Sequence, residues 1–259
     1  MMNLYGEGSQ SGIKIDSDGQ LTNDYTNGDN TGTQIPGDLT IEGVGGNRGV
    51  EMVGAGPVLA IYFSTLTQTN SVRLTGKATG VGGVGIYNTR KIDLDINEYK
   101  NRSPNHLITG NASAAGGTGI YNSNDYFYTA SGNDIITGIG PAAGGFGIYN
   151  SGTITTYQGN DTIDALTGGF GGGGKYKLDE GNDTVKGFGI GTFDGGPGDD
   201  SLYLPSGSYK VDRRGIAGED YFITPSGTDK TMFIKDFEHL YIGTNSYGFP
   251  IRHSPTLTG

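Results

Sequence analysis

Four acidic triplets in the second half of the chain have the residue types and the spacing to bind a cation. They are Gly132–Asp134, Gly159–Asp161, Gly181–Asp183 and Gly198–Asp200, and their aspartates follow one another after 27, 22 and 17 residues. If successive turns of a repeat stack these aspartates, the charges repel one another unless a cation lies between them. Calcium suits such a place, because it takes about six to eight oxygen ligands and accepts carboxylates together with backbone carbonyls. The alternative is that the triplets form metal-free Asx turns.

The triplets lie within a longer internal repeat. The tetrapeptide Gly-Ile-Tyr-Asn occurs at 85–88, 119–122 and 147–150, and each copy begins nine residues after the glycine of a preceding extended stretch. Weaker copies continue the series in both directions. One marker residue stands at the equivalent position of each coil, and successive markers are 33, 34, 28, 27, 22 and 17 residues apart. The markers are Gly43, Gly76, Gly110, Gly138, Ala165, Gly187 and Leu204. The coils therefore shorten toward the C-terminus.

Each full coil contains three short extended stretches separated by glycine-rich bends. Short runs of alternating apolar residues bounded by Gly, Asn and Ser are typical of strands, and no window shows a sustained helical period. A solenoid also accommodates 259 residues and 50 glycines without one large globular core, because each repeat contacts only its neighbours. We therefore predict an all-β fold, a right-handed parallel β-helix or β-roll solenoid with tapering coils and a C-terminal β cap.

The predicted organisation has three parts. Residues 1–37 are an N-terminal leader or partial coil, 38–204 form the parallel β-solenoid with calcium-binding turns, and 205–259 form the C-terminal β cap. Stacking of the tetrapeptides predicts an interior isoleucine row, an amide ladder along the axis, and a tyrosine row that serves structural packing. The three rows are Ile86, Ile120 and Ile148, then Asn88, Asn122 and Asn150, then Tyr87, Tyr121 and Tyr149.

One segment resembles a known family. Gly195–Tyr203 (GGPGDDSLY) matches the nonapeptide GGxGxDxUx of RTX, or haemolysin-type, calcium-binding β-roll proteins at every specified position. The resemblance implies that Asp200 is a side-chain ligand and that carbonyls of the glycine-rich loop lie near the metal. The other triplets match only the G-x-D-x-U part, so we expect about one to three ions, first of all between the turns of Asp183 and Asp200. The candidate ligands of this Ca²⁺ cofactor are Asp134, Asp161, Asp183, Gly195, Pro197, Gly198, Asp199 and Asp200.

Composition argues against several classes of partner. The net charge of −10 disfavours nucleic acid and anionic membranes and fits a cation-binding surface. The lack of cysteine removes disulfides and thiolate metal sites, and no apolar run is long enough to span a bilayer. The RTX resemblance implies a secreted, extracellular protein, and the first residues show no N-terminal signal peptide. Calcium ions are the expected partner, and carbohydrate or a cell-surface polymer is a further candidate.

A β-helical enzyme is the alternative function. Polysaccharide lyases and epimerases with β-helical folds place acids and bases on one outer sheet, and calcium would then be a structural cofactor. Counting from the tetrapeptides predicts that Ile92, Tyr126 and Ile154 point inward. The outward substrate patch would be Lys91, Asp93, Asp95, Asp125, Phe127 and Tyr157. A solvated sheet exterior explains the same residues.

The sequence assigns no catalytic residue. The three histidines belong to no Ser/His/Asp grouping and have no metal-ligand spacing. We therefore favour a non-catalytic structural or recognition module over the enzyme.

Overall fold

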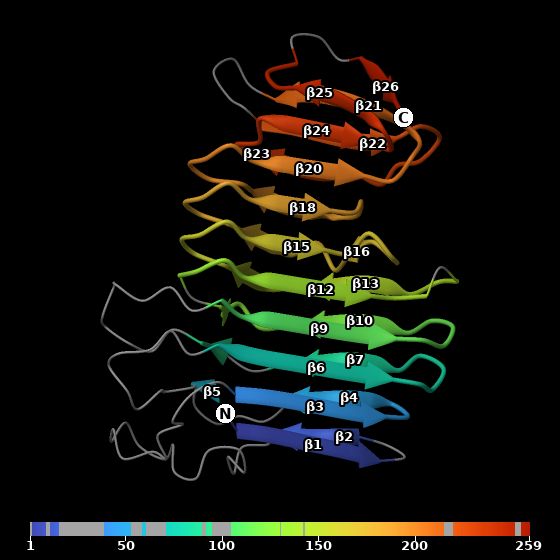
Figure 1. The fold of residues 1–259 in the computed structure, drawn as a ribbon. Coiled ribbons are helices and arrows are strands. Elements are labelled where there is room, and N and C mark those ends of the chain that lie inside the picture. Colours follow the sequence, from blue (N-terminus) through green and yellow to red (C-terminus); the bar gives the residue numbers. More distant parts are fainter. Residues whose placement is uncertain are drawn as a thin grey trace.

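The computed structural model describes residues 2–8, 11–15, 39–52, 59–60, 71–89, 92–94, 105–129, 131–141, 143–214, 220–251 and 255–259. All regular elements in these ranges are β-strands, which stack coil upon coil along the molecule (Figure 1). The predicted class, an all-β parallel solenoid, is confirmed. The described part of the chain contains no helix long and apolar enough to cross a membrane.

The coils wind through three sheets. The first sheet has ten strands in the order β1 (Met2–Gly8), β3 (Leu39–Gly45), β6 (Val72–Ala78), β9 (Leu107–Ala112), β12 (Ile135–Ile139), β15 (Thr162–Asp164), β18 (Thr184–Lys186), β20 (Ser201–Leu204), β24 (His239–Ile242) and β25 (Asn245–Gly248). The second has six, namely β2 (Ser11–Ile15), β4 (Arg48–Met52), β7 (Val84–Asn88), β10 (Thr118–Asn122), β13 (Phe146–Asn150) and β16 (Phe170–Gly171). The third has ten, namely β5 (Leu59–Ala60), β8 (Ile92–Asp93), β11 (Phe127–Tyr128), β14 (Thr153–Thr155), β17 (Lys175–Lys177), β19 (Gly191–Asp194), β23 (Met232–Lys235), β22 (Asp220–Pro225), β21 (Ser208–Arg214) and β26 (Thr256–Thr258).

The first sheet keeps the register that the glycine markers predict. Gly43 pairs with Gly76, Gly76 with Gly110, and Gly110 with Gly138. Glycine is required at Gly110 because a Cβ there would overlap the backbone carbonyl of Gly119 in the neighbouring β10. The repeated glycines therefore let the first and second sheets approach each other closely inside the coil.

Interior rows run along the axis as the tetrapeptides predict. The side-chain amide of Asn88 donates to Oδ1 of Asn122 at 2.8 Å, and that of Asn122 donates to Oδ1 of Asn150 at 2.8 Å. The side-chain amide of Asn150 donates to the carbonyl oxygen of Lys175 at 3.0 Å. The ladder thus satisfies buried polar groups within the apolar core. The isoleucine row is fully buried and consists of Ile86, Ile120 and Ile148.

The tyrosines stack on the outer face of the second sheet. Ring centroids are 4.9 Å apart for Tyr87 and Tyr121 and 5.2 Å apart for Tyr121 and Tyr149. Arg48 lies over the first ring at 4.3 Å from its centroid, and Phe146 packs against the last ring at 5.4 Å. Both ends of the stack are therefore covered, in agreement with a packing role.

The taper removes one side of the coil. Equivalent residues in successive coils are separated by 28, 27, 22 and then 17 residues. The second sheet ends with the two residues of β16, and the next coil adds only a single bridge between Phe170 and Gly189. The shortest coils therefore have two sides, and their core contains the fully buried Val185, Phe193 and Leu202.

One register prediction is wrong. Phe127, predicted to face outward, is fully buried and pairs with Ile92 and Ile154, whereas Tyr126 is 48% exposed. The cause is an extra residue at the corner after β10, where the backbone N–H of Tyr126 donates to Oδ1 of Asn124 at 3.0 Å. This Asx turn shifts the strand by one residue, and a one-residue shift exchanges the two faces of a strand.

The chain leaves the coil after β20 and then returns to it. β21 and β22 form an antiparallel pair, after which β23 and β24 resume parallel pairing with β19 and β20. The antiparallel strands β25 and β26 are the outermost strands at this end. The described residues of the 205–259 segment therefore combine one further parallel coil with antiparallel strands that cover the sheet edges.

Candidate metal centre

The turns from the third sheet to the first share a left-handed residue. Gly196 of the nonapeptide has φ = 90°, and the residues at the same place in the two preceding turns, Tyr157 and Asp179, have φ of 66° and 63°. Residues other than glycine rarely adopt this conformation. Two residues further on, Gly159 and Gly181 have φ of 140° and 153°. The partial copies therefore keep the left-handed residue of the nonapeptide turn although they lack its paired glycines.

The aspartates of the triplets form a buried column beside these turns. All four are at most 1% exposed. The backbone N–H of Asp134 donates to Oδ1 of Asp161, that of Asp161 to Oδ1 of Asp183, and that of Asp183 to Oδ1 of Asp200, each at 2.7 Å. The triplets thus stack in register, as their spacing predicts.

Two residues outside the triplets complete the column. At one end, Nδ1 of His106 accepts a hydrogen bond from the backbone N–H of Val72 at 2.9 Å. At the other end, Oε2 of Glu238 accepts from the backbone N–H of Asp200 at 2.7 Å. The triplet pattern predicts neither, because both differ from it in residue type. The spacing could find His106, which lies four positions before the marker Gly110. Glu238 lies four positions before Ile242, which only the pairing of β20 with β24 identifies as a marker.

His106 ends the column without adding charge. Its backbone N–H donates to Oδ1 of Asp134 at 2.6 Å. Because Nδ1 accepts a hydrogen bond, the neutral ring carries its proton on Nε2. Burial lowers the pKa of His106 to about 4, so the imidazole is neutral at physiological pH.

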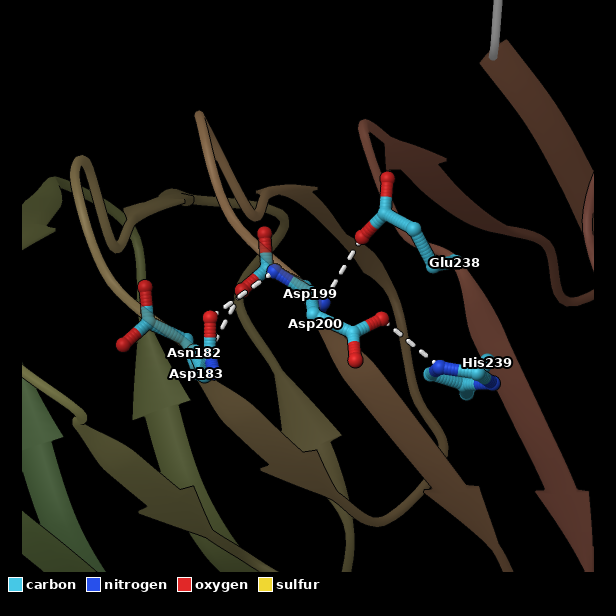
Figure 2. Close-up of polar contacts among 6 residues, drawn as sticks. All are labelled: Asn182, Asp183, Asp199, Asp200, Glu238 and His239. Atoms are coloured by element: carbon cyan, nitrogen blue, oxygen red, sulfur yellow. Dashed lines mark hydrogen bonds and ion pairs between the residues drawn. The ribbon is translucent and has the colours of Figure 1, made fainter.

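An exposed row runs beside the column, one residue earlier in each turn. The backbone N–H of Asn160 donates to Oδ1 of Asn133 at 2.7 Å, that of Asn182 to Asn160 at 2.9 Å, and that of Asp199 to Asn182 at 3.1 Å. In this row each backbone N–H donates to the earlier coil, whereas in the column each backbone N–H donates to the later coil. Each turn is therefore tied to both neighbours. At the last turn, Nε2 of His239 lies 2.7 Å from Oδ1 of Asp199 (Figure 2).

The second carboxylate oxygen of the column is unsatisfied. Within the described part of the chain, Oδ2 of Asp161, Asp183 and Asp200 is buried without a hydrogen-bond partner. Burial raises the pKa of Asp161 and Asp200 to about 7 and that of Asp183 to about 8. Repulsion from the neighbouring carboxylates adds to the effect of burial at Asp183. At neutral pH, these carboxyls gain stability from either a proton or a cation.

Backbone oxygens lie close to the paired glycines of the nonapeptide turn, and one of them lies beside the last carboxylate. A Cβ at Gly195 would collide with the carbonyl oxygen of Asp236 and with Oδ2 of Asp200. A Cβ at Gly196 would collide with the carbonyl oxygen of Asp179. No three His, Asp or Glu side chains among the described residues gather closely enough to hold a metal ion by themselves. A cation here would therefore combine one or two carboxylates with backbone carbonyls, a mixture that calcium accepts.

The remaining predicted ligands of the nonapeptide take different positions. The carbonyl oxygen of Pro197 accepts a hydrogen bond from the N–H of Gly181 at 3.1 Å, which leaves one lone pair for a metal. A Cβ at Gly198 would overlap the carbonyl oxygen of Gly181, so this turn packs tightly on the one before. Asp199 is exposed and belongs to the outer row, where it contacts His239.

The structure describes only part of the alternative substrate patch. Lys91, Asp95 and the side chain of Asp93 lie outside the described residues. Asp125 is exposed at the corner before β11, and the ring of Tyr157 packs edge-on against Tyr128 at 5.5 Å. Phe127 lies in the core and cannot touch a substrate on this face.

Comparison of the chain with protein-family models, with curated proteins and with solved structures found no match. What the protein does must therefore be inferred from the column and its surroundings.

Proposed function

We propose that this chain is a calcium-stabilised β-solenoid that is secreted and acts outside the cell as a structural or recognition module, with carbohydrate or a cell-surface polymer as its partner. The observation that carries the proposal is the column, in which Asp161, Asp183 and Asp200 are buried one coil apart. Among the described residues, the Oδ2 atoms of these three aspartates have no hydrogen-bond partner. Buried ionised carboxylates are costly unless a cation compensates them.

The ligand chemistry favours calcium over other cations. Carboxylate and carbonyl oxygens suit hard cations, and the sequence contains no cysteine that would attract a softer metal. Nδ1 of His106 is engaged by the N–H of Val72, so this nitrogen is not offered to a metal. Magnesium demands near-octahedral geometry and keeps several waters, whereas calcium tolerates irregular sets of protein oxygens.

Calcium binding would supply folding energy to the solenoid. A ligand that binds only the folded state stabilises it by about 2.7 kcal/mol when its concentration is about 100 times its dissociation constant. Extracellular calcium modules work at dissociation constants of about 0.1 to 1 mM. The solenoid would then gain stability where calcium is abundant, outside the cell.

Thermal unfolding in calcium and in chelator tests the proposal. Calcium at a few millimolar should raise the unfolding temperature of the parent protein above its value in EGTA, while equimolar magnesium should give a smaller shift. The exposed Asp229→Asn variant, which changes the same functional group away from the column, should respond like the parent. Equal unfolding temperatures in calcium and EGTA would show that the triplets serve only as hydrogen-bonded turns.

A further inference from the structure

The cap provides a sixth acceptor of the column, in a turn of different length. From the left-handed residue to the column residue there are four positions in the nonapeptide turn, Gly196 to Asp200, but only two in the cap turn, Asp236 to Glu238. The side chain of Glu238 is one methylene longer than that of aspartate and reaches the N–H of Asp200 at 2.7 Å (Figure 2).

The cap also brings a second oxygen to the last carboxylate. Asp236 has φ = 52°, and its carbonyl oxygen and Oδ2 of Asp200 both lie against the position that a Cβ of Gly195 would fill. Asp200 is fully buried, and its Oδ2 has no hydrogen-bond partner among the described residues. Because the two oxygens lie beside the same glycine, they are acceptors close enough to share one cation. Two acceptor oxygens held this close favour a cation between them.

The charges around these two oxygens are mainly negative. The carboxylates of Glu238, Asp199 and Asp236 lie near enough to Asp200 to repel its carboxylate. Nζ of Lys235 contacts the carboxylate of Asp236 at 2.7 Å, so the side chain of Asp236 is paired while its carbonyl stays beside Asp200. His239 pairs with Asp199 in the outer row, at 2.7 Å.

We propose that a hard divalent cation of calcium size binds between β20 and the cap, with Oδ2 of Asp200, the carbonyl oxygen of Asp236 and the carboxylate of Glu238 as protein ligands. Glu238 uses Oε2 for the backbone N–H of Asp200, which leaves Oε1 as its ligand atom. This inference rests on the proposed function, because both assume that the chain binds calcium. It adds that the cap docks on the solenoid through the cation.

Docking by a cation explains how the long last coil closes. The residues that pair across β20 and β24 are 38 apart, against 17 for the coil before. The hairpin of β21 and β22 accounts for most of the added length and places the return strands far along the chain. A loop of this length costs more entropy to close than the short coils. An ion that contacts both Asp200 and the Asp236–Glu238 turn offsets part of that cost.

Hydrogen exchange with and without calcium tests this site on the full chain. In the parent, calcium should slow amide exchange in β24 by about tenfold or more, because docking of the cap is then linked to the ion. Glu238→Gln keeps an oxygen for the N–H of Asp200 but removes the charge. This variant should lose the calcium effect in β24, retain it in β15 and β18, and bind one ion fewer by native mass spectrometry.

The outcomes separate this inference from the proposed function. Protection by calcium in β15 and β18 but not in β24 of the parent overturns the cap site and leaves the calcium-stabilised solenoid intact. The cap site is likewise overturned if Glu238→Gln binds as many ions as the parent. A calcium effect nowhere in the chain overturns both proposals. Should Glu238→Gln fail to fold, the exchange pattern of the parent decides alone, with Asp229→Asn as the matched folded control.

Discussion

Replacement of Asp183 by asparagine separates the two interpretations of the triplets. Oδ1 of Asp183 accepts from the N–H of Asp161, and its own N–H donates to Asp200, both at 2.7 Å. Asparagine keeps the size and the Oδ1 acceptor and removes only the charge. If the column serves hydrogen bonding alone, Asp183→Asn should be as stable as the parent or more stable in every buffer. If the column binds calcium, the effect should change sign between buffers.

The expected magnitude follows from the ionisation of Asp183. Burial and neighbouring carboxylates raise its pKa from 3.8 to about 8. At pH 7 without a cation, this shift opposes folding by about 4 kcal/mol as an upper limit, and by about 2 kcal/mol once water at the nearby surface screens the charge. The variant avoids this cost because an amide is uncharged. The amide N–H groups lack a partner in the buried column, however, which costs about 1 kcal/mol. Asp183→Asn should therefore gain about 1 kcal/mol in EGTA.

In calcium the same variant should lose stability. It lacks a carboxylate ligand, so the stabilisation by calcium, about 2.7 kcal/mol at about 100 times the dissociation constant of the parent, should fall by about half or more. Unfolding temperatures by circular dichroism should move by about 2 to 4 °C per kcal/mol for a chain of this size. Asp183→Asn should melt above the parent in EGTA and below it in calcium, with Asp229→Asn unchanged in both. A shift of one sign in both buffers would contradict calcium binding at Asp183.

Two further perturbations follow from the same geometry. The pKa values of Asp161, Asp183 and Asp200 are raised above 3.8 to about 7 or 8, so their stabilisation is complete at low pH and is lost as the pH rises toward 8. The unfolding temperature in EGTA should therefore fall between about pH 4 and pH 8, and calcium should reduce the fall, because it replaces the proton on the same oxygens. Gly181→Ala should cost about 2 to 4 kcal/mol in urea unfolding, since φ is 153° and the Cβ would overlap the carbonyl of Gly159. The matched Gly248→Ala, whose Cβ meets nothing within 4 Å, should be near neutral.

The repeat could be predicted because it depends on short local patterns. Gly76, Gly110 and Gly138 mark positions where a Cβ would overlap a neighbouring backbone, so the residue type follows directly from the packing. Asn88 and Asn122 mark a buried ladder in which each amide bonds to the next coil. Wherever packing between coils demands one residue type, the sequence repeats it and the register becomes visible.

The rest depends on features that vary from coil to coil. The predicted face of Phe127 is wrong because the corner at Asn124 has one residue more than the corners of the adjacent coils, and nothing in the strand itself shows this. His106 and Glu238 escape prediction because imidazole, aspartate and glutamate all accept the same backbone hydrogen bond. A position that requires only an acceptor does not repeat a residue type. The return of β23 and β24 to their sheets follows a long hairpin, so no local spacing predicts it.

Because the coils shorten toward the C-terminus, the length of chain that each coil releases under tension changes along the molecule. When tension removes one coil, the chain gains the length of that coil at about 3.5 Å per extended residue. A coil of 17 residues near the cap would release about 60 Å, whereas a coil of 34 residues in the N-terminal half would release about 120 Å. If the solenoid is pulled from its C-terminal end and the cap has opened, it would lengthen in steps that become larger as successive coils unravel. The coils that give the early, short steps are those joined by the carboxylate column.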